Sequence, residues 1–290
     1  MYAEEWPLLM FTLLSQLAIG TFLIMTLVYS ILESKNSQLA LEVIKPGMRA
    51  VGPLMAVALL LSLFHLGRPF GAYLSISNLG SSWLSREIIT TGGFFALWLV
   101  SYYLYRKGSV NKVLNWVACL TGLAAVYSMA GIYSSSIKPA WTDVNTFIAF
   151  FGTTFVLGII GASGSILYST KNSDLSAVAG EVLKKLGFIA VFAALIPLLY
   201  LPVFIAGLSA GSGAAQSSAQ LLSSYGIQLF MRWALSLTGL GLLFYVVYKQ
   251  IRTAQEVPMN MVYLSLALVL VGEFLGRYLF YAIGVPVMIG

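Results

Sequence analysis

Eight separate apolar segments of about 20 residues constrain this 290-residue chain more than any other feature of its sequence. A stretch of that length crosses the hydrocarbon core of a bilayer as a helix. Backbone groups find no water in lipid, so only helices or a closed barrel can span it. The uninterrupted run Leu54–Leu63 lacks the alternation of a barrel strand, and we therefore expect an all-α polytopic membrane protein, a bundle of eight transmembrane helices. The expected spans are residues 7–32, 47–65, 87–105, 113–135, 144–168, 186–207, 226–248 and 259–282.

Two of these spans carry local signals. Pro197 and Pro202 lie inside the sixth span and predict a kink there. The fifth span is dense in small residues, which let neighbouring backbones approach closely, and helix packing explains them. These residues are Gly158, Gly161, Ala162, Ser163, Gly164 and Ser165.

The connections between the spans are short, so residues 1–290 are expected to form a single integral membrane domain. The first span follows Glu4-Glu5 rather than basic residues and is too long for a cleaved signal. The longest connections are 66–86 and 208–225. The second is rich in Gly, Ser, Ala and Gln, which favours a flexible or partner-covered loop.

Composition excludes several classes of protein. The chain is 59% hydrophobic and 9% charged, whereas a soluble domain carries about 25% charged residues. Cys119 is the single cysteine and His65 the single histidine, which excludes a disulfide within the chain, an iron–sulfur cluster and a haem held by two histidines, and makes a zinc site implausible. The net charge of +6 is spread over membrane loops and forms no basic stripe of a nucleic-acid binder.

The basic residues predict how the bundle faces, because Lys and Arg are retained on the cytoplasmic side. The even-numbered connections carry only Arg68, Arg86 and Lys138, and neither terminus carries any. We therefore expect both termini and the even connections to lie outside, in the periplasm of a bacterial inner membrane. The first, third, fifth and seventh connections carry eleven basic residues: Lys35, Lys45, Arg49, Arg106, Lys107, Lys112, Lys171, Lys184, Lys185, Lys249 and Arg252.

Ionisable residues within the spans gather toward that same outer side. Charge inside a membrane is costly, so such residues are candidates for function. With no comparable cluster in the inner halves of the spans, the pattern predicts a polar site that opens to the periplasmic face. Its members are His65 at the end of the second span, Glu87 at the start of the third, Arg232 in the seventh, and Glu273 and Arg277 in the eighth.

Each of these residues also has a structural interpretation. Glu273 and Arg277 are four apart with the acid first, which suits an ion pair on one helix face. Arg232 is placed to snorkel to the interface or to neutralise an acid. Arg86 is consistent with an interface charge, and His65 with a histidine bonded to a carbonyl. The tryptophans near the outer boundary are expected as interfacial anchors: Trp6, Trp83 and Trp141.

Two strings around these residues belong together: His65–Pro69 (HLGRP) and Ser82–Ile88 (SWLSREI). Together they resemble the anchor subunits of bacterial dimethyl sulfoxide reductases, and the likeness extends along the whole chain. The wider superfamily includes the quinone anchors of polysulfide and nitrite reductases. Supporting fragments are Glu5–Leu8 (EWPL), Pro139–Thr142 (PAWT) and Gly276–Tyr281 (GRYLFY).

The resemblance implies a haem-free subunit that binds menaquinol and anchors an iron–sulfur subunit and a molybdopterin catalytic subunit. It also implies that His65 and Glu87 take part in quinol binding and oxidation. The molybdenum and the clusters would then reside in the partners, so this chain alone would not perform the terminal reduction. Anchors of related reductases, such as polysulfide reductase, remain an alternative.

Quinol chemistry agrees with these two residues. Oxidation releases two protons, and His65 is the only side chain whose ordinary pKa lies near neutrality. We expect His65 to accept the first proton and Glu87 to be the second acceptor or the exit relay. Arg68 and Arg86 are candidates for tuning Glu87 or contacting the partner. A secondary transporter is the main rival, but it needs a site near the midplane with access from both sides.

The orientation is testable with single cysteines at Gly213 and Gln255 in a Cys119→Ser background. The charge asymmetry places position 213 outside and position 255 inside. An impermeant thiol reagent applied to intact cells should therefore label only position 213. Labelling of position 255 alone would overturn the orientation.

Overall fold

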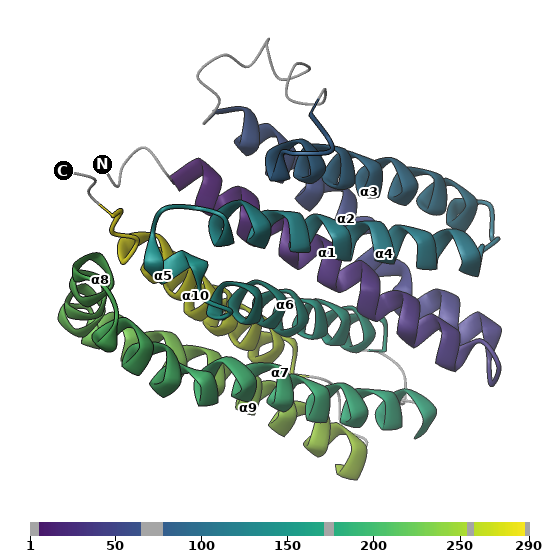
Figure 1. The fold of residues 1–290 in the computed structure, drawn as a ribbon. Coiled ribbons are helices and arrows are strands. Elements are labelled where there is room, and N and C mark those ends of the chain that lie inside the picture. The colour runs from purple at the N-terminus through teal and green to yellow at the C-terminus, as the bar shows by residue number, and fades with distance from the viewer. Residues whose placement is uncertain (1–5, 65–77, 171–176, 254–257, 288–290) are drawn as a thin grey trace.

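The computed structural model describes residues 6–64, 78–170, 177–253 and 258–287, without the side chains of 177–179 and 250–253 (Figure 1). Within these residues, eight helices are long and apolar enough to cross a membrane, which confirms the expected fold class. Two short helices, α5 (Pro139–Thr142) and α8 (Gly213–Ser224), lie between them. The eight are α1 (Trp6–Leu32), α2 (Ser37–Phe64), α3 (Trp83–Arg106), α4 (Lys112–Ser134), α6 (Asn145–Ser169), α7 (Ala177–Ala210), α9 (Gly226–Thr253) and α10 (Met259–Ala282).

Helices α2 and α7 begin well before the expected spans, which started at residues 47 and 186. The length of an apolar run indicates only the part of a helix that lies in the hydrocarbon core. The helix itself can continue into the polar interface, because its backbone hydrogen bonds do not require apolar side chains. The added turns carry charged residues such as Glu42 and Lys45 in α2 and Glu181 in α7. Helix α7 continues through both of its prolines.

The expectation of a flexible loop at 208–225 is wrong, because most of this segment is helix α8. Ser212 caps α8 by accepting a hydrogen bond from the backbone N–H of Ala215 at 3.5 Å. Ala215, Ser218 and Leu222 recur at helical spacing and are buried. A short helix gains its stability mainly from packing of such a buried face. The buried face of α8 consists of Ala215, Ser218 and Leu222, and a face with so few large apolar residues is hard to recognise in the sequence.

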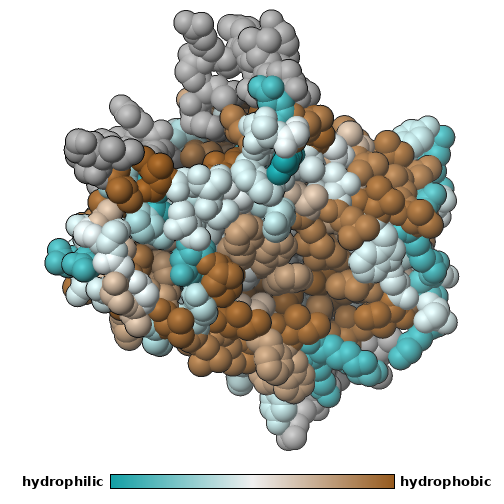
Figure 2. All heavy atoms as spheres, in the orientation of Figure 1, coloured by the Kyte–Doolittle hydropathy of each residue, from teal (hydrophilic) through white to brown (hydrophobic). Residues whose placement is uncertain are grey.

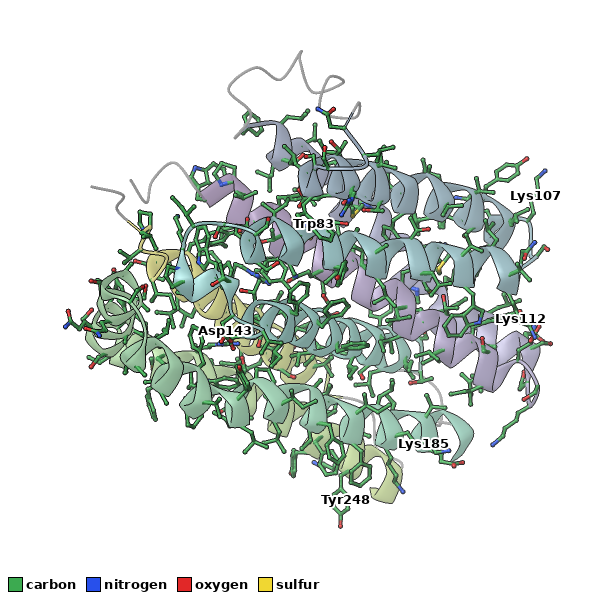
Figure 3. All side chains as sticks on the ribbon, in the orientation of Figure 1. Trp83, Lys107, Lys112, Asp143, Lys185 and Tyr248 are labelled. Atoms are coloured by element: carbon green, nitrogen blue, oxygen red, sulfur yellow. The ribbon has the colours of Figure 1, made fainter. Side chains whose placement is uncertain are left out.

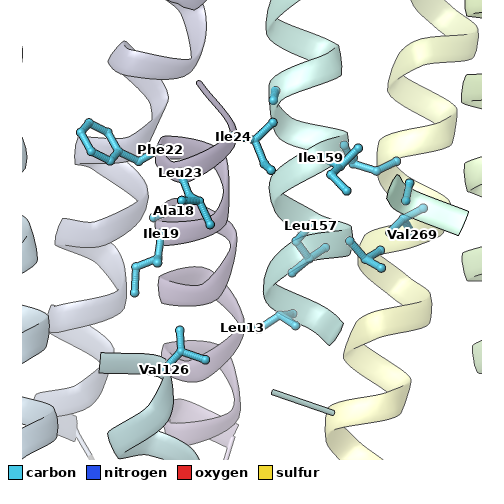
Figure 4. Packing of buried hydrophobic residues seen from close by; sticks show 14 of the residues in the cluster. Leu13, Ala18, Ile19, Phe22, Leu23, Ile24, Val126, Leu157, Ile159 and Val269 are labelled. Atoms are coloured by element: carbon cyan, nitrogen blue, oxygen red, sulfur yellow. The ribbon is translucent and has the colours of Figure 1, made fainter. Parts of the chain in front are cut away.

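Helix α1 is the centre of the bundle. It contacts α2, α4, α6 and α10, and its membrane-spanning part is buried almost throughout. Figure 4 shows Ile24 of α1 pointing toward α6, which carries Leu157 and Ile159, whereas Phe22 lies on the opposite side of α1. The other helices expose large apolar side chains instead, as expected for surfaces that face lipid.

The outer surface has the division expected of a membrane protein. Figure 2 shows a broad apolar area across one face, with polar residues toward its edges. Lys107, Lys112 and Lys185 lie at one end of the bundle, and Asp143 lies toward the other (Figure 3). Helices α5 and α8 lie at the end opposite the lysines, with the start of α1 and the end of α10 (Figure 1).

Helices α1 and α6 cross with their backbones in contact. A Cβ placed on Gly158 would lie 2.7 Å from the Cα of Gly20, and one placed on Gly20 would lie 2.9 Å from the Cα of Gly158. Neither clash can be relieved by turning a side chain, because backbone atoms meet. Gly158, one of the small residues of the fifth expected span, therefore does serve helix packing.

We predict that Gly158→Ala lowers the stability of the detergent-solubilised protein by about 1–3 kcal/mol, because an added methyl forces the two helices apart. The control is Gly241→Ala in α9, where an added Cβ meets no atom within 4 Å. Helix propensity favours alanine at both positions, so the control should be neutral or stabilising. Equal unfolding midpoints for the two variants would contradict the close crossing.

Candidate functional site

Glu87 lies on the second turn of α3, close to the end of the bundle that carries α5 and α8. The side chain of Ser82 caps the helix by accepting from the backbone N–H of Ser85 at 3.3 Å. Glu87 is only 5% exposed, so a carboxyl group is held inside the apolar part of the bundle. Such a group is costly to bury and is a candidate for function.

A cavity of about 450 Å³ opens beside Glu87 between α2 and α3, with Phe11 of α1 at its wall. Its lining is almost entirely apolar, and the polar groups are Glu87, Thr91 and Ser62. The Ser62 hydroxyl donates to the carbonyl of Leu59 at 2.7 Å. The Thr91 hydroxyl is buried and has no hydrogen-bond partner among the described residues. This slot therefore offers a carboxyl and a hydroxyl, on consecutive turns of α3, to a flat apolar molecule.

Of the other residues expected near Glu87, the structure describes Arg86 but not His65 or Arg68. The last residue before His65 that lines the slot is Leu63, near the end of α2. The Arg86 guanidinium bonds to the carbonyls of Leu79 and Gly80 at 2.9 and 2.6 Å, so it braces the turn before α3. It also lies 4.4 Å from the centroid of Trp83.

Two tyrosines form a buried polar pair close to the slot. The hydroxyls of Tyr133 in α4 and Tyr281 in α10 are 2.7 Å apart. The carboxyl of Glu87 and the guanidinium of Arg277 both interact electrostatically with this pair. The tyrosine pair thus interacts both with Glu87 and with Arg277, one of the charges predicted in the eighth span.

The expected ion pair between Glu273 and Arg277 is wrong: no such pair lies within 4.0 Å in the described part of the chain. Glu273 accepts hydrogen bonds from Thr153 of α6 at 2.6 Å and Ser236 of α9 at 3.2 Å. Arg277 donates to Gln16 of α1 at 2.7 Å. Residues four apart share a helix face, but the side chains of Glu273 and Arg277 bond to different neighbouring helices. Their hydrogen bonds therefore link α10 to α6, α9 and α1.

Arg277 and Arg232 keep buried donors without partners. Nε and Nη1 of Arg277, Nε of Arg232 and Nε2 of Gln16 have none among the described residues. Arg277 lies 3.7 Å over the ring of Phe150, and Arg232 lies 4.4 Å over Trp233. Both guanidinium groups interact electrostatically with Glu273. A cavity of about 40 Å³ beside Arg232 is large enough for a water molecule.

Sequence reasoning missed Tyr133, Tyr281 and Gln16. A signal was present for two of them: Tyr281 follows Arg277 by four residues, and Gln16 follows Thr12 by four, so each pair shares a helix face. Nothing in the spacing of Tyr133 indicated its partner. Trp141, expected as an interfacial anchor, is buried instead and donates to the carbonyl of Phe280 at 2.7 Å.

Comparison with known proteins finds matches along almost the whole chain. The family model described as the dimethyl sulfoxide reductase anchor subunit matches residues 1–283. The protein is similar to a chain of the anaerobic dimethyl sulfoxide reductase of Escherichia coli strain K12, with 28% identity over 98% of its own length and 96% of the relative. It is also similar to the chain of the same name in Haemophilus influenzae, with 29% identity over 96% of its own length and 94% of the relative.

The buried charges predict which of two single variants, Glu273→Gln or Arg277→Gln, loses more stability. Glu273 is the carboxyl that interacts with both guanidinium groups, so Glu273→Gln leaves the two cations uncompensated and should cost about 3–5 kcal/mol of stability. Arg277→Gln leaves one cation and one carboxyl, and should cost about 1–3 kcal/mol through the lost bond to Gln16. Denaturation midpoints in detergent measure both.

The double variant Glu273→Gln/Arg277→Gln is the control for this order. It removes a cation together with the carboxyl, so it should be more stable than Glu273→Gln alone. A double variant that is less stable than Glu273→Gln would show that the carboxyl does not compensate Arg277.

Proposed function

Because the chain belongs to the family of dimethyl sulfoxide reductase anchor subunits, we propose that it binds menaquinol in the slot beside Glu87 and hands the electrons to an iron–sulfur partner. The observation that carries the proposal is one buried carboxyl on the wall of an otherwise apolar cavity of about 450 Å³. That volume lies within the range of small-molecule sites. An apolar wall suits the ring and the first part of an isoprenoid tail.

His65 and Glu87 are the proposed proton acceptors. Oxidation of a quinol yields two electrons and releases two protons. A histidine and a carboxyl within hydrogen-bond reach of the two hydroxyl groups can accept them. The hydroxyl of Thr91, which has no partner in the described chain, is free to hydrogen-bond a ring oxygen. Leu84, Ile88 and Phe95 keep water from the ring by lining the same slot.

The buried charges of α9 and α10 are proposed to tune this site from behind. Arg277, Glu273 and Arg232 are not among the residues that line the slot. The tyrosine pair, which interacts electrostatically with both Glu87 and Arg277, is the proposed link between these charges and the slot. These are positioning residues, because they hold the electrostatic environment of the proton acceptor rather than contacting the quinol. Arg86 and Arg68 are proposed to support the entrance of the slot or to contact the partner.

The proposed partners are an iron–sulfur electron-transfer subunit and a molybdopterin catalytic subunit. Electron transfer requires the iron–sulfur partner to lie near the slot. Glu87 is on the second turn of α3, whose first residue, Trp83, lies away from the end of the bundle that carries Lys107 and Lys112 (Figure 3). That end is a hydrocarbon thickness of about 30 Å away. With a single histidine in the sequence, no haem held by two histidines relays electrons across that distance. We therefore place the partner on the outer, periplasmic face of a bacterial inner membrane.

Activity with two electron donors tests the proton acceptors. His65→Ala and Glu87→Gln should each lower quinol-driven reduction by about 10²–10⁴-fold, since each removes a proton acceptor. Reduction driven by an artificial dye, which bypasses this subunit, should stay unchanged in the assembled complex. The matched control is Glu181→Gln, an exposed carboxyl at the far end that pairs with Lys185 at 3.1 Å.

A second variant protects the test against failed assembly. Ala56→Phe narrows the slot without touching a proton acceptor, so it should raise the KM for quinol more than it lowers kcat. Near-normal quinol turnover in both acceptor variants would refute the site. Equal loss of quinol-driven and dye-driven activity in every slot variant would also count against it.

A further inference from the structure

Helix α2 is interrupted at Pro46, at the end of the bundle away from Glu87. Proline has no N–H, so the carbonyl of Glu42, four residues earlier, loses its helical donor. Ser169 of α6 donates to that carbonyl at 2.9 Å. Ser165 of α6 donates to the carbonyl of Val43 at 2.8 Å and accepts from the N–H of Gly47 at 2.9 Å. Two serines of α6 thus complete the broken ladder of α2.

Two cavities meet at this interruption. A wide one of about 660 Å³ opens at the helix ends and is lined by residues of α2 and α6. A narrower one of about 360 Å³ continues from it between α1, α2, α6 and α10. Pro46, Ala50 and Tyr168 line both cavities. The two cavities therefore adjoin, and together they are called the recess: the wide cavity is its mouth and the narrow cavity its groove.

The mouth is basic. Lys45 and Arg49 line it from consecutive turns of α2, and both are exposed. The described residues contain three ion pairs within 4.0 Å, and neither residue takes part in any of them. Glu42 also lines the mouth, so the three charges leave a net +1. That charge complements one phosphodiester group.

The groove is lined mainly by apolar residues, two of them glycines of α6. Gly161 and Gly164 of α6 present no side chain to it, and Leu54, Leu157 and Leu266 are among the apolar residues that line it. A Cβ added at Gly164 would meet only the side chain of Leu266, at 3.5 Å. The groove therefore has room beside Gly164 for a flexible hydrocarbon chain.

We propose that this recess binds an anionic phospholipid, with the phosphodiester of its headgroup between Lys45 and Arg49 and one acyl chain in the groove. A lipid tail is already in an apolar solvent, so the groove alone gives little affinity. The headgroup charge decides which lipid binds, because each Lys or Arg near the surface attracts an anionic headgroup. A neutral quinol gains nothing from the two cations, which favours a phospholipid as the occupant. The site is separate from the slot beside Glu87.

The purified full-length chain in detergent, titrated with phospholipid and followed by native mass spectrometry, tests this site. Phosphatidylglycerol and phosphatidylcholine with identical chains are compared. Lys45→Gln and Arg49→Gln should each weaken the binding of phosphatidylglycerol about fivefold. Gly164→Leu should abolish it by filling the groove. The control is Arg106→Gln/Lys107→Gln, which removes two cations from the same end of the bundle without altering the recess.

The outcomes separate the possible occupants. Preference for phosphatidylglycerol that is lost in the recess variants and kept in the control supports the proposal. Equal binding of both lipids, or an unchanged preference in Gly164→Leu, would overturn it, since the charge or the groove would then play no part. Displacement of phosphatidylglycerol by inorganic phosphate at equal concentration would show a free-anion site instead. Retention of quinone rather than phospholipid would also refute it.

Discussion

The backbone contact between α1 and α6 at Gly20 and Gly158 is the interaction from which the other helices take their positions. It brings the two most buried helices together, and α2, α4 and α10 then pack on the remaining sides of α1. A helix surrounded in this way has no face for lipid, so nearly every residue of α1 contacts protein. Phe11 and Leu17 of α1 contribute to the walls of the slot and of the recess, respectively.

Within lipid, a polar group must find its partner on another helix, and this requirement organises the interior. Ser165 and Ser169 complete the ladder broken by Pro46, and Thr153 and Ser236 bond Glu273. Among the buried groups without a partner in the described chain, the donors of Arg277, Arg232 and Gln16 belong to one cluster around Glu273. Unpaired buried groups are costly to keep, which is consistent with a functional rather than a purely structural cluster.

The sequence singled out Glu87, whose role stays a prediction, and the structure differs from the sequence-based expectations about the other ionisable residues. The one-sided distribution of ionisable residues indicated a polar site, and Glu87 does line a cavity. Helical spacing alone predicted an ion pair between Glu273 and Arg277, and this was wrong because the partners come from α1, α6 and α9. Tyr133 and Tyr281 meet although 148 residues separate them, and no local pattern reports such a contact.

The sequence by itself determined the eight membrane-spanning helices, because a run of about 20 apolar residues is a local property of the chain. It also predicted that the ionisable residues within the spans lie toward one end of the bundle, because their positions along each span can be read directly. It also excluded an iron–sulfur cluster and a haem held by two histidines from this chain, since cysteine and histidine are each present once. Tertiary structure decided which helix α1 touches at Gly20, where the slot beside Glu87 opens, and that residues 213–224 form a helix. These depend on surfaces of distant segments meeting, and such packing is a property of the whole bundle rather than of any one span.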